Sequence, residues 1–411
     1  MITSKLSATA ADVATAPPSG PESAPSVVDV WSHIEPRYGG VGPAAGALAT
    51  EVQRISDFQS YQVAVCNAHE TVLADGISPT ALRIPLSGFR PISDLRLRPL
   101  LSTAIRTCSI CHVHGMWFPA TLAARKIAAD LGKPVVSSVH GTLEAWELKN
   151  KSYKKRPYGL FLERPSLARS SCLRALSEKE AGEYRAFGLK NPIAVVPTGI
   201  GRFSRTDTAP LLARFPQLRS KQVVLYLSRV HHKKGVLNLI QSWRSVASKH
   251  ADSHLLVIGA DFEGTTATAK HLISQYGLEK AVTFTGVVTP SEKQQALSLA
   301  RYFCLPSYSE GLSAAVLEAL SIGLPVIITP ACNVDGVESG GAGYVVSNNP
   351  PELGEAISEA LSREGSTWDL MSNAAKVLAL TKYDWSIIGT QMLSVYQWLL
   401  GGPKPACVLP W

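Results

Sequence analysis

Two series of short apolar segments alternate with helix-length segments along this chain. In the first half they occupy 27–34, 62–67, 81–86, 109–114, 134–140, 172–177 and 193–199, and in the second half 222–229, 254–259, 281–286, 302–307, 325–330 and 343–347. Near-continuous apolar strands separated by helices are typical of parallel sheets that are covered on both faces. The sequence therefore predicts an α/β protein made of two Rossmann-like domains that face each other across a cleft.

The two series are preceded by a tail and separated by a polar segment. Residues 1–26 are rich in Ala, Ser, Thr and Pro and lack the apolar core of a signal peptide, which predicts a disordered tail. The segment 197–222 contains Pro and Gly and is typical of a linker between domains. We expect one domain over 27–200, a second over 201–383, and a final amphipathic helix over 384–400.

Composition narrows the class of protein further. The chain has 411 residues, of which 45% are hydrophobic and 18% charged, and no run approaches the ~18 apolar residues of a membrane span. Seven scattered cysteines suit a reducing compartment, so we expect a cytoplasmic protein. The net charge of +8 fits nucleic acid, an anionic membrane or phosphorylated small molecules as partners. Nucleic acid is not expected, because no recognition motif accompanies the charge.

The segment LPSYSEGLSAAVLEALSIGLPVI (305–327) carries the clearest chemical pattern. A strand ends, a loop with Glu310 and Gly311 follows, and a helix that contains Glu318 comes next. Because ligands of parallel sheets bind beyond the carboxyl ends of the strands, this loop is expected to line a site. Gly311 lets a ligand approach the backbone, and Glu318 can accept hydrogen bonds from ribose hydroxyls.

A second motif, YLSRVHHKKGV (226–236), places the basic residues Arg229 and Lys234 after another strand of the second domain. Free backbone N–H groups of Leu312 and Ser313, at the start of the helix, would add a diphosphate-binding element.

These motifs resemble those of a known enzyme family. SEGLSAAVLEALSIGLPVI (309–327) is similar to the E-x7-E signature of the GT4-type retaining glycosyltransferases, which have the GT-B fold, and 226–236 is similar to the second anchor of that family. The resemblance extends from Val27 to Leu400. HGTLEAW (140–146) resembles the branch of the family that acts in bacterial polysaccharide biosynthesis.

The resemblance implies an activity. The expected enzyme moves a sugar from a nucleotide-sugar donor to a hydroxyl of a glycan or lipid-linked acceptor, with retention at the anomeric carbon and without a metal or another cofactor. The family has no agreed nucleophile, so the leaving phosphate is expected to accept the proton of the acceptor. The final helix is expected to cross back to the first domain.

The resemblance also implies which residues of the second domain hold the donor. Arg229 and Lys234 are expected at the diphosphate, Glu318 at the ribose, Glu310 at the sugar together with the backbone of Gly311, Leu312 and Ser313, and Val287 and Val288 at the base. Glu310 and, from the first domain, His140 are the expected catalytic residues.

The first domain is expected to supply the acceptor side. In IEPRYGGVGPAAGALA (34–49), Gly39 and Gly40 match glycines that the family uses near the donor phosphates. His140 ends a strand where the family places a histidine close to the reacting centre. His114 and Gly115 match an HVHGLW-like segment and are expected to line the acceptor side.

Three other functions stay open at this stage. Gly40, Gly42 and Ala45 fit the dinucleotide fingerprint G-x-G-x-x-A, although its acidic partner, Glu70, comes late, so an NAD-dependent dehydrogenase is one alternative. A nucleotide-sugar 2-epimerase of the same fold is the second. The third is a sugar-binding relative that binds nucleotide without turnover.

The segment TCSICHVHGMW (107–117) contains C-x-x-C-H, the spacing that attaches a c-type haem. Cys111 and His112 are neighbours in a predicted strand, so their side chains point to opposite faces of the sheet. Cys108, Cys111 and His112 therefore cannot converge on one metal, and we expect neither haem nor zinc here.

The segment 149–169 contains seven basic residues and one acidic residue, Glu163, interleaved with aromatic and aliphatic side chains. Such a segment can lie on an anionic membrane surface, here the inner face of the membrane, close to a lipid-linked acceptor. The alternative is a solvated helix that covers the sheet. The sequence favours neither interpretation over the other.

Overall fold

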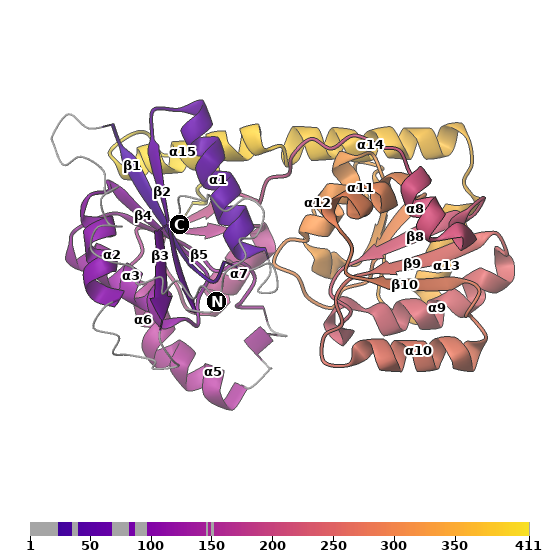
Figure 1. Cartoon of the computed structure of the whole chain (residues 1–411). Coiled ribbons are helices and arrows are strands. Elements are labelled where there is room, and N and C mark those ends of the chain that lie inside the picture. Colours follow the sequence, from indigo (N-terminus) through magenta and orange to yellow (C-terminus); the bar gives the residue numbers. More distant parts are fainter. Residues whose placement is uncertain are drawn as a thin grey trace, which may run out of the picture. The chain divides into compact units, whose positions relative to one another are not determined.

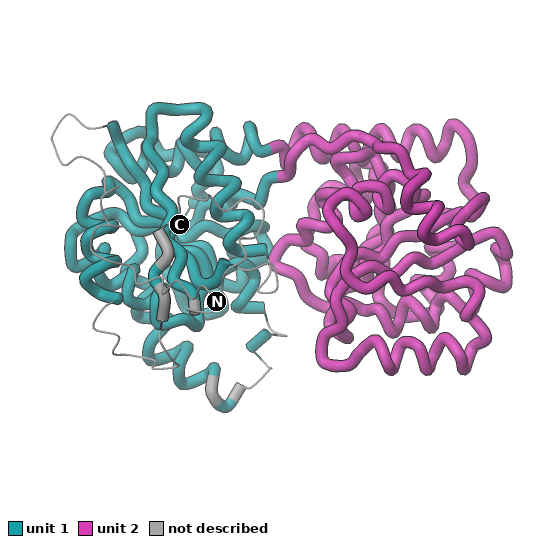
Figure 2. Tube along the Cα trace, in the orientation of Figure 1, with its two compact units in different colours: residues 1–199, 385–411 teal, residues 200–384 magenta. Residues whose placement is uncertain are grey.

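The computed structural model describes residues 24–34, 40–67, 82–86, 97–144, 147–148 and 152–410. The chain divides into two compact units, of which unit 1 comprises residues 1–199 and 385–411 and unit 2 comprises residues 200–384 (Figure 2). Each unit contains one parallel sheet, and each of the thirteen predicted strand segments contains a strand. The predicted α/β fold with two parallel sheets is confirmed.

Unit 1 has a seven-stranded parallel sheet with the order β3-β2-β1-β4-β5-β6-β7. Its strands are β1 (Ser26–Ser32), β2 (Gln59–Asn67), β3 (Leu82–Leu86), β4 (Ile110–His114), β5 (Val135–Ser138), β6 (Cys172–Ala175) and β7 (Ile193–Val195). The strand order reverses between β1 and β4, which is therefore the switch point where open parallel sheets bind ligands. The register pairs Asp29 with His112 across this switch point.

Helices cover both faces of the sheet of unit 1. On one face lie α1 (Val41–Ile55) and α15 (Trp385–Leu399), and on the other lie α2 (Leu97–Arg106) and α3 (Pro119–Asp130) (Figure 1). The contact between α1 and α15 is close, because a Cβ atom on Gly389 would lie 2.6 Å from Cγ of Glu51. Between β5 and β6 the chain forms α5 (Ser152–Tyr158), the π-helix Gly159–Glu163 and α6 (Arg164–Leu167), and between β6 and β7 it forms α7 (Glu178–Ala186).

Unit 2 has a six-stranded parallel sheet with the order β10-β9-β8-β11-β12-β13. Its strands are β8 (Gln222–Leu227), β9 (Ser253–Ile258), β10 (Val282–Gly286), β11 (Tyr302–Leu305), β12 (Val326–Ile328) and β13 (Gly343–Val345). Its helices are α8 (Ala209–Arg214), α9 (Val236–Lys249), α10 (Thr265–Tyr276), α11 (Pro290–Leu299), α12 (Ala314–Ser321), α13 (Pro350–Ser362) and α14 (Ser366–Lys382). The strand order reverses between β8 and β11, the second switch point of the molecule.

Several strands end earlier than the apolar pattern predicts. The segment 134–140 ends its strand at Ser138, because His140 adopts a left-handed backbone with φ 55°. The segment 302–307 ends at Leu305, and Ser307 already belongs to the loop that carries Glu310. Buried apolar residues continue past the last ladder hydrogen bond, so hydrophobicity marks these strand ends imprecisely. None of the helices in the described part of the chain is both long enough and apolar enough to cross a membrane.

Candidate functional site

In unit 2, charged side chains gather at the switch point between β8 and β11. Lys234 lies in a short turn after β8, and Glu310 lies in the loop after β11. The Lys234 Nζ atom is 2.6 Å from Glu310 Oε2, and both side chains are about nine-tenths buried. The other oxygen of Glu310 accepts a hydrogen bond of 2.8 Å from the Ser307 hydroxyl. Two residues that the sequence places in separate motifs therefore form one ion pair.

The turn that presents Lys234 requires glycine at the next position. Gly235 has φ 73°, and a Cβ atom there would lie 1.9 Å from the carbonyl oxygen of Pro306. The backbone N–H of Tyr308 also donates to the Lys233 carbonyl at 2.8 Å. The turn after β8 and the loop after β11 thus lie backbone to backbone, and a side chain at Gly235 would force them apart.

Asn333, a residue that the sequence analysis missed, holds the loop that carries Glu310. It adopts a left-handed backbone with φ 55° after β12. Its side-chain amide donates to the carbonyl oxygens of Glu310 and Gly311, the latter at 3.1 Å. Asparagine is one of the few residues that tolerate a left-handed backbone. An asparagine shortly after a predicted strand is therefore a weak sequence signal for such a residue.

The start of α12 differs in one detail from the expectation. The backbone N–H of Ser313 is not free, because it donates to the carbonyl of Cys332 at 3.2 Å. The Ser313 side chain makes no capping bond. Within the described residues, the first-turn amides of Ala314, Ala315 and Val316 have no partner. The amides that stay available at the start of this helix therefore include those of Ala314, Ala315 and Val316, while the Leu312 side chain packs against the core of unit 2.

The second glutamate of the E-x7-E pattern lies within α12 and has a partner from another helix. Glu318 Oε1 accepts a hydrogen bond of 2.8 Å from Lys293 on α11. The carboxylate is four-fifths buried and the ammonium one-third exposed. The sequence pattern contains no hint of Lys293, because it lies 25 positions before Glu318.

Arg229 and the two predicted base-contacting valines lie at the ends of β8 and β10. Arg229 is exposed, and its guanidinium lies over the ring of Phe262 at 5.2 Å. The hydroxyl of Tyr226 donates to the Arg229 carbonyl at 3.1 Å. Val287 is 73% exposed, whereas Val288 packs against the core of unit 2. Val287 therefore exposes more of its side chain to a ligand than Val288 does.

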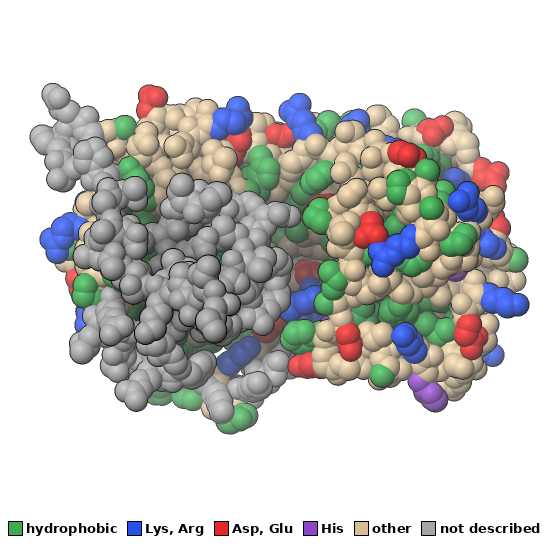
Figure 3. Space-filling model, in the orientation of Figure 1, with side chains coloured by type: hydrophobic (Ala, Val, Ile, Leu, Met, Phe, Trp, Pro, Cys, Tyr) green, Lys and Arg blue, Asp and Glu red, His purple; other side chains and the backbone are tan. Residues whose placement is uncertain are grey.

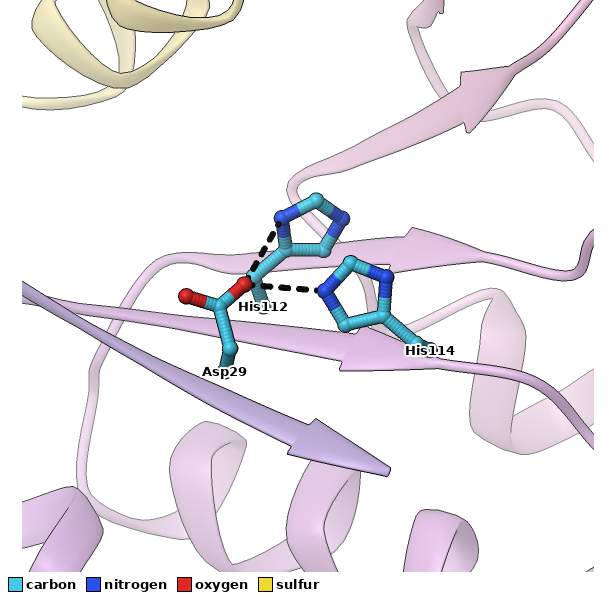
Figure 4. Close-up of side chains that lie close together, drawn as sticks. All are labelled: Asp29, His112 and His114. Atoms are coloured by element: carbon cyan, nitrogen blue, oxygen red, sulfur yellow. Dashed lines mark hydrogen bonds and ion pairs between the residues drawn. The ribbon is translucent and has the colours of Figure 1, made fainter. Parts of the chain in front are cut away.

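In unit 1, a network of buried polar side chains spans the switch point between β1 and β4 (Figure 4). Nε2 of His114 lies 2.8 Å from Asp29 Oδ1, and Nδ1 of His114 lies 3.2 Å from Nε2 of His140. His112 Nδ1 lies 3.6 Å from the same carboxylate oxygen. The side chains of Asp29, His112 and His114 are at most 1% exposed. His114, which the sequence predicts at the acceptor side, is therefore buried within this network, and the partly exposed ring of the network is that of His140.

Helix α15 takes part in this network. The two ring nitrogens of His112 bond to the hydroxyls of Tyr396 at 2.7 Å and Ser138 at 2.8 Å. Tyr396 lies on α15, some 284 positions from His112, so the last helix carries a polar contact to the switch point as well as its packing face. Asp29 and Tyr396 were both missed by the sequence analysis, because no local motif marks either of them.

Three ligand-type atoms of Asp29, His112 and His114 lie within 4.8 Å of one another, a spacing that a metal ion would also accept. The remaining oxygen of Asp29 accepts from the Ser60 hydroxyl at 3.3 Å. Every ring nitrogen and carboxylate oxygen of the three side chains thus has a protein partner, and the geometry describes a hydrogen-bond network. The cysteines of C-x-x-C-H do not join it, because Cys111 packs into the core under α2 and α3.

Burial controls protonation in this network. It raises the pKa of Asp29 to about 8, with the Ser60 hydroxyl and the Arg174 guanidinium opposing the shift. It lowers the pKa of His112, His114 and His140 well below the usual value for histidine. The three imidazoles are therefore neutral at pH 7.

The loops that follow the strands of this switch point have strained backbones. Among the described residues of unit 1, the non-glycine residues with positive φ are His33, Trp117 and His140. They follow β1, β4 and β5, three neighbouring strands. Such conformations persist only where the surroundings enforce them, and they cluster at functional sites.

Two buried carboxylates support the conformations of Trp117 and His140. Glu163 accepts from the Trp117 amide at 2.7 Å and pairs with Arg125, which also donates to the Gly115 carbonyl at 2.8 Å. Glu180 accepts from the Gly141 amide at 2.6 Å, directly after His140. Glu163, which the sequence shows only as the single acid of a basic segment, thus fixes the HGMW loop from within a π-helix.

The predicted glycines and the basic segment are placed in part. Gly39 and Glu70 lie outside the described residues, and Gly40 is an exposed N-cap of α1 with φ −88°. In the basic segment, Tyr153 and Phe161 are each 72% exposed, and Leu160 and Leu162 are exposed to a smaller extent. Lys155 is engaged by the carbonyl of Glu147 at 2.7 Å. On the face of unit 2 visible in Figure 3, basic and acidic side chains are interspersed rather than gathered by sign.

Two family models match this chain. The model described as "Glycosyl transferases group 1" matches residues 213–377, and the model "Glycosyltransferase Family 4" matches residues 38–201. Among curated relatives, the GDP-mannose:cellobiosyl-diphosphopolyprenol alpha-mannosyltransferase of Xanthomonas campestris is 24% identical over 79% of this chain and 83% of its own length. Both models describe glycosyltransferases rather than dehydrogenases or epimerases.

Solved structures agree on the fold. Sucrose-phosphate synthase from Thermosynechococcus elongatus superimposes with a TM-score of 0.71 at 17% identity, covering 92% of this chain and 99% of that one. Anabaena Alr3699/HepE in complex with UDP gives a TM-score of 0.73 at 16% identity, covering 90% and 99%. With both halves of the chain matched by the two models and the fold shared with solved glycosyltransferase structures, the protein belongs to the GT4-type glycosyltransferases of the GT-B fold.

Proposed function

We propose that the protein is a retaining hexosyltransferase that moves a sugar from a nucleoside-diphosphate sugar to a hydroxyl acceptor without a metal ion. The observation that carries the proposal is the Lys234–Glu310 pair at the switch point of unit 2. Its Glu310 member lies in the loop that leads into α12, whose first-turn amides have no partner among the described residues, and such a helix start can bind an anion.

The charges of unit 2 fit a diphosphate leaving group. As the bond between the anomeric carbon and the phosphate oxygen breaks, negative charge accumulates on the diphosphate, and Lys234, Arg229 and the first turn of α12 can stabilise it. In the bound state the Lys234 ammonium would exchange Glu310 for a phosphate oxygen, which leaves the Glu310 carboxylate to accept hydrogen bonds from sugar hydroxyls. Glu318, held by Lys293, would accept from the ribose.

Retention follows if the acceptor attacks from the side that the leaving group vacates. The bond from the anomeric carbon to the acceptor oxygen forms as the bond to the phosphate oxygen breaks, and the acceptor proton passes to that phosphate oxygen. No protein nucleophile is required. His140 would contact the reacting sugar, while Gly39, Gly40 and Gly115 would contribute backbone to the phosphate and acceptor side.

The nature of the donor and of the acceptor is supported by the relatives. The Xanthomonas relative is named for a GDP-mannose donor and a polyprenol-linked sugar acceptor, and the Anabaena structure contains UDP. We therefore extend the proposal to a nucleotide-sugar donor and a lipid-linked glycan acceptor in polysaccharide biosynthesis.

Thermal unfolding with GDP, UDP, ADP and their sugars tests the donor. A ligand that binds the folded state at 100 times its Kd adds about 2.7 kcal/mol of stability. We expect one nucleotide of the panel to raise the melting temperature and Lys234→Ala to abolish the rise. If no nucleotide shifts the melting temperature of the wild type, the proposal fails. Transfer with the active donor in excess EDTA tests the absence of a metal requirement, and loss of transfer there would contradict it.

A peripheral contact with anionic membrane is supported by the segment 152–167. Tyr153 and Phe161 expose most of their side chains, and Arg156 beside them is exposed as well. Aromatic side chains can enter the headgroup region while basic groups meet anionic lipids. Lys155 is not available for this purpose, because it binds the Glu147 carbonyl and lies over the Trp117 ring at 5.8 Å.

Co-sedimentation with vesicles that contain increasing fractions of anionic lipid tests this contact, which would place the enzyme at the cytoplasmic face of the membrane. We expect binding to rise with the anionic fraction and to be lost in Tyr153→Ala/Phe161→Ala and in Arg156→Glu. Leu370→Ala is the matched control, because Leu370 is equally exposed but lies on α14 of unit 2. Binding that ignores lipid charge, or that all variants retain, would exclude the contact.

A further inference from the structure

Asp29, His114 and His140 form a continuous hydrogen-bonded chain from the middle of β1 to the loop that follows β5. The carboxylate of Asp29 is 2.8 Å from Nε2 of His114, and Nδ1 of His114 is 3.2 Å from Nε2 of His140. Both nitrogens of His114 are therefore occupied. Nδ1 of His140 has no partner among the described residues, and His140 is the member of the chain that is partly exposed.

The directions of these two hydrogen bonds depend on each other. A neutral imidazole has one N–H, so His114 donates with one nitrogen and must accept with the other. If Asp29 is protonated, it donates to His114, His114 donates to His140, and His140 carries its proton on Nδ1. If Asp29 is ionised, both bonds reverse, and His140 carries its proton on Nε2 and presents a bare Nδ1.

We propose that Asp29, acting through His114, determines whether the outward nitrogen of His140 is a hydrogen-bond donor or an acceptor. Asp29 and His114 are then positioning residues for the sugar transfer proposed above, and the catalytic part of the inference rests on that proposed function. The protonation pattern of His140 does not depend on it. A donor at Nδ1 can bind a sugar hydroxyl or a phosphate oxygen, whereas an acceptor there would repel the phosphate.

The pKa values fix the pH range of the change. Burial raises the pKa of Asp29 to about 8 and lowers the pKa values of His114 and His140. Of these three side chains, only that of Asp29 therefore changes its charge between pH 7 and 9. Below about pH 8 His140 carries Nδ1–H, and above it Nε2–H. Other ionisable groups also face Asp29 or His140 from neighbouring elements. They are His112, Cys108 and Cys111 in or next to β4, Arg174 on β6 and Tyr396 on α15. Glu180 on α7 acts through the Gly141 amide, which it accepts from.

Nuclear magnetic resonance of 15N-labelled histidine in the full-length protein tests the pattern without substrate. We expect the wild-type His140 resonances to change from the Nδ1–H to the Nε2–H tautomer between pH 7 and 9. In Asp29→Asn, the amide can donate permanently to His114 while its oxygen accepts from Ser60, so His140 should keep Nδ1–H at every pH. Tyr396→Phe removes a buried hydroxyl that bonds His112 alone and is the matched control, which should retain the change.

The wild-type titration decides the matter even if Asp29→Asn does not fold. A His140 tautomer that stays constant from pH 7 to 9 in the wild type would overturn the proposal, as would a stoichiometric metal ion in the purified protein. A pH-dependent tautomer in Asp29→Asn would do the same.

The catalytic part has its own measurement. In the wild type, kcat/KM should fall about tenfold per pH unit above the apparent pKa, as expected when one required proton is lost. Asp29→Asn should lack this alkaline limb, and Tyr396→Phe should keep it. If the tautomer changes but no sugar is transferred with any donor, the proposed function fails and the protonation linkage stands. If sugar is transferred with the same alkaline limb in Asp29→Asn, the catalytic role of Asp29 fails.

Discussion

The two switch points of this molecule hold their polar groups in opposite ways. At the switch point of unit 2, Lys234, Glu310 and Arg229 come from turns and loops beyond the strand ends. At the switch point of unit 1, Asp29 and His114 lie within the strands and are fully buried. The first arrangement offers fixed charge to a ligand. In the second arrangement the charged group is buried, and its protonation state affects only which nitrogen of the partly exposed His140 ring carries the proton. Variants that remove a charge in unit 2, or that fix the protonation of Asp29 in unit 1, can therefore test this difference between the two switch points.

The largest expected effect is the loss of activity when the pair of unit 2 is broken. Lys234→Ala and Glu310→Ala should each lower kcat/KM by about 10²–10³, the range for removing one transition-state electrostatic contact. The fold should be retained, but the melting temperature should fall as well, because removing either partner leaves the other charge largely buried and unpaired. Steady-state kinetics with the active donor measures this. Glu359→Ala breaks an exposed ion pair with Arg363 on the same unit and serves as the control. Near-wild-type sugar transfer in either site variant would contradict a catalytic role for the Lys234–Glu310 pair.

A smaller effect is expected when the support of the Glu310 loop is removed. Asn333→Gly retains the left-handed backbone but loses the donors to Glu310 and Gly311, and we expect about a tenfold loss in kcat/KM, equivalent to the one or so kcal/mol of such bonds. Asn333→Ala should lose the same activity and some stability as well, because alanine is strained at φ 55°. Equal melting temperatures for the two variants would contradict the strain, and full activity in Asn333→Gly would contradict the support.

For unit 1 we expect the free energy of unfolding to depend on pH, because folding shifts the pKa values of buried carboxyl groups. Folding raises the pKa of Asp29 from 3.8 to about 8 and that of Glu180 from 4.5 to about 7, so the folded state binds protons that the unfolded state has released. Stability from these groups is therefore fully present in acid and is lost as pH rises toward 8. The lowered pKa values of the histidines act in the opposite sense, but only below their usual value of 6.5.

The free energy of unfolding should accordingly fall between pH 6.5 and 8, by about 1.4 kcal/mol per pH unit for each carboxyl still protonated in the folded state. Calorimetry at several pH values measures the slope. Asp29→Asn should flatten it, whereas Glu310→Ala should leave it unchanged. A slope of the same size in Asp29→Asn would show that the hidden charge of unit 1 lies elsewhere.

The smallest effect is expected at Glu318, the residue that we propose binds the ribose. Lys293→Met removes the partner of Glu318 on a partly exposed surface, and such pairs contribute about 0–1 kcal/mol. We expect the KM for the donor to rise by a few-fold with kcat unchanged, since the carboxylate would lose its orientation and keep its charge. Glu318→Ala should raise KM more than Lys293→Met does. The reverse order would mean that Lys293 itself meets the donor.

The residues that sequence reasoning identified share one property: each lies in a short motif beside a strand end. Glu310, Lys234 and Arg229 follow apolar strands, so the rule that ligands bind beyond carboxyl ends already marks them. His140 was found in the same way. Local patterns do not show which of these groups are already bonded within the fold: the Ser313 amide donates to the Cys332 carbonyl, and the His114 ring is buried.

The apolar periodicity of the chain was sufficient to predict two parallel sheets, their helices and the loops that carry the charged residues, because period and strand-end chemistry are local properties. The partners of those residues were decided by tertiary structure. Asp29 meets His114 only because β1 and β4 are neighbours, Tyr396 reaches His112 from 284 positions away, and Asn333 holds the Glu310 loop from the end of another strand. Long-range pairing has no local signature, and burial, which sets the protonation of Asp29 and the histidines, exists only once the sheet and α15 have packed together.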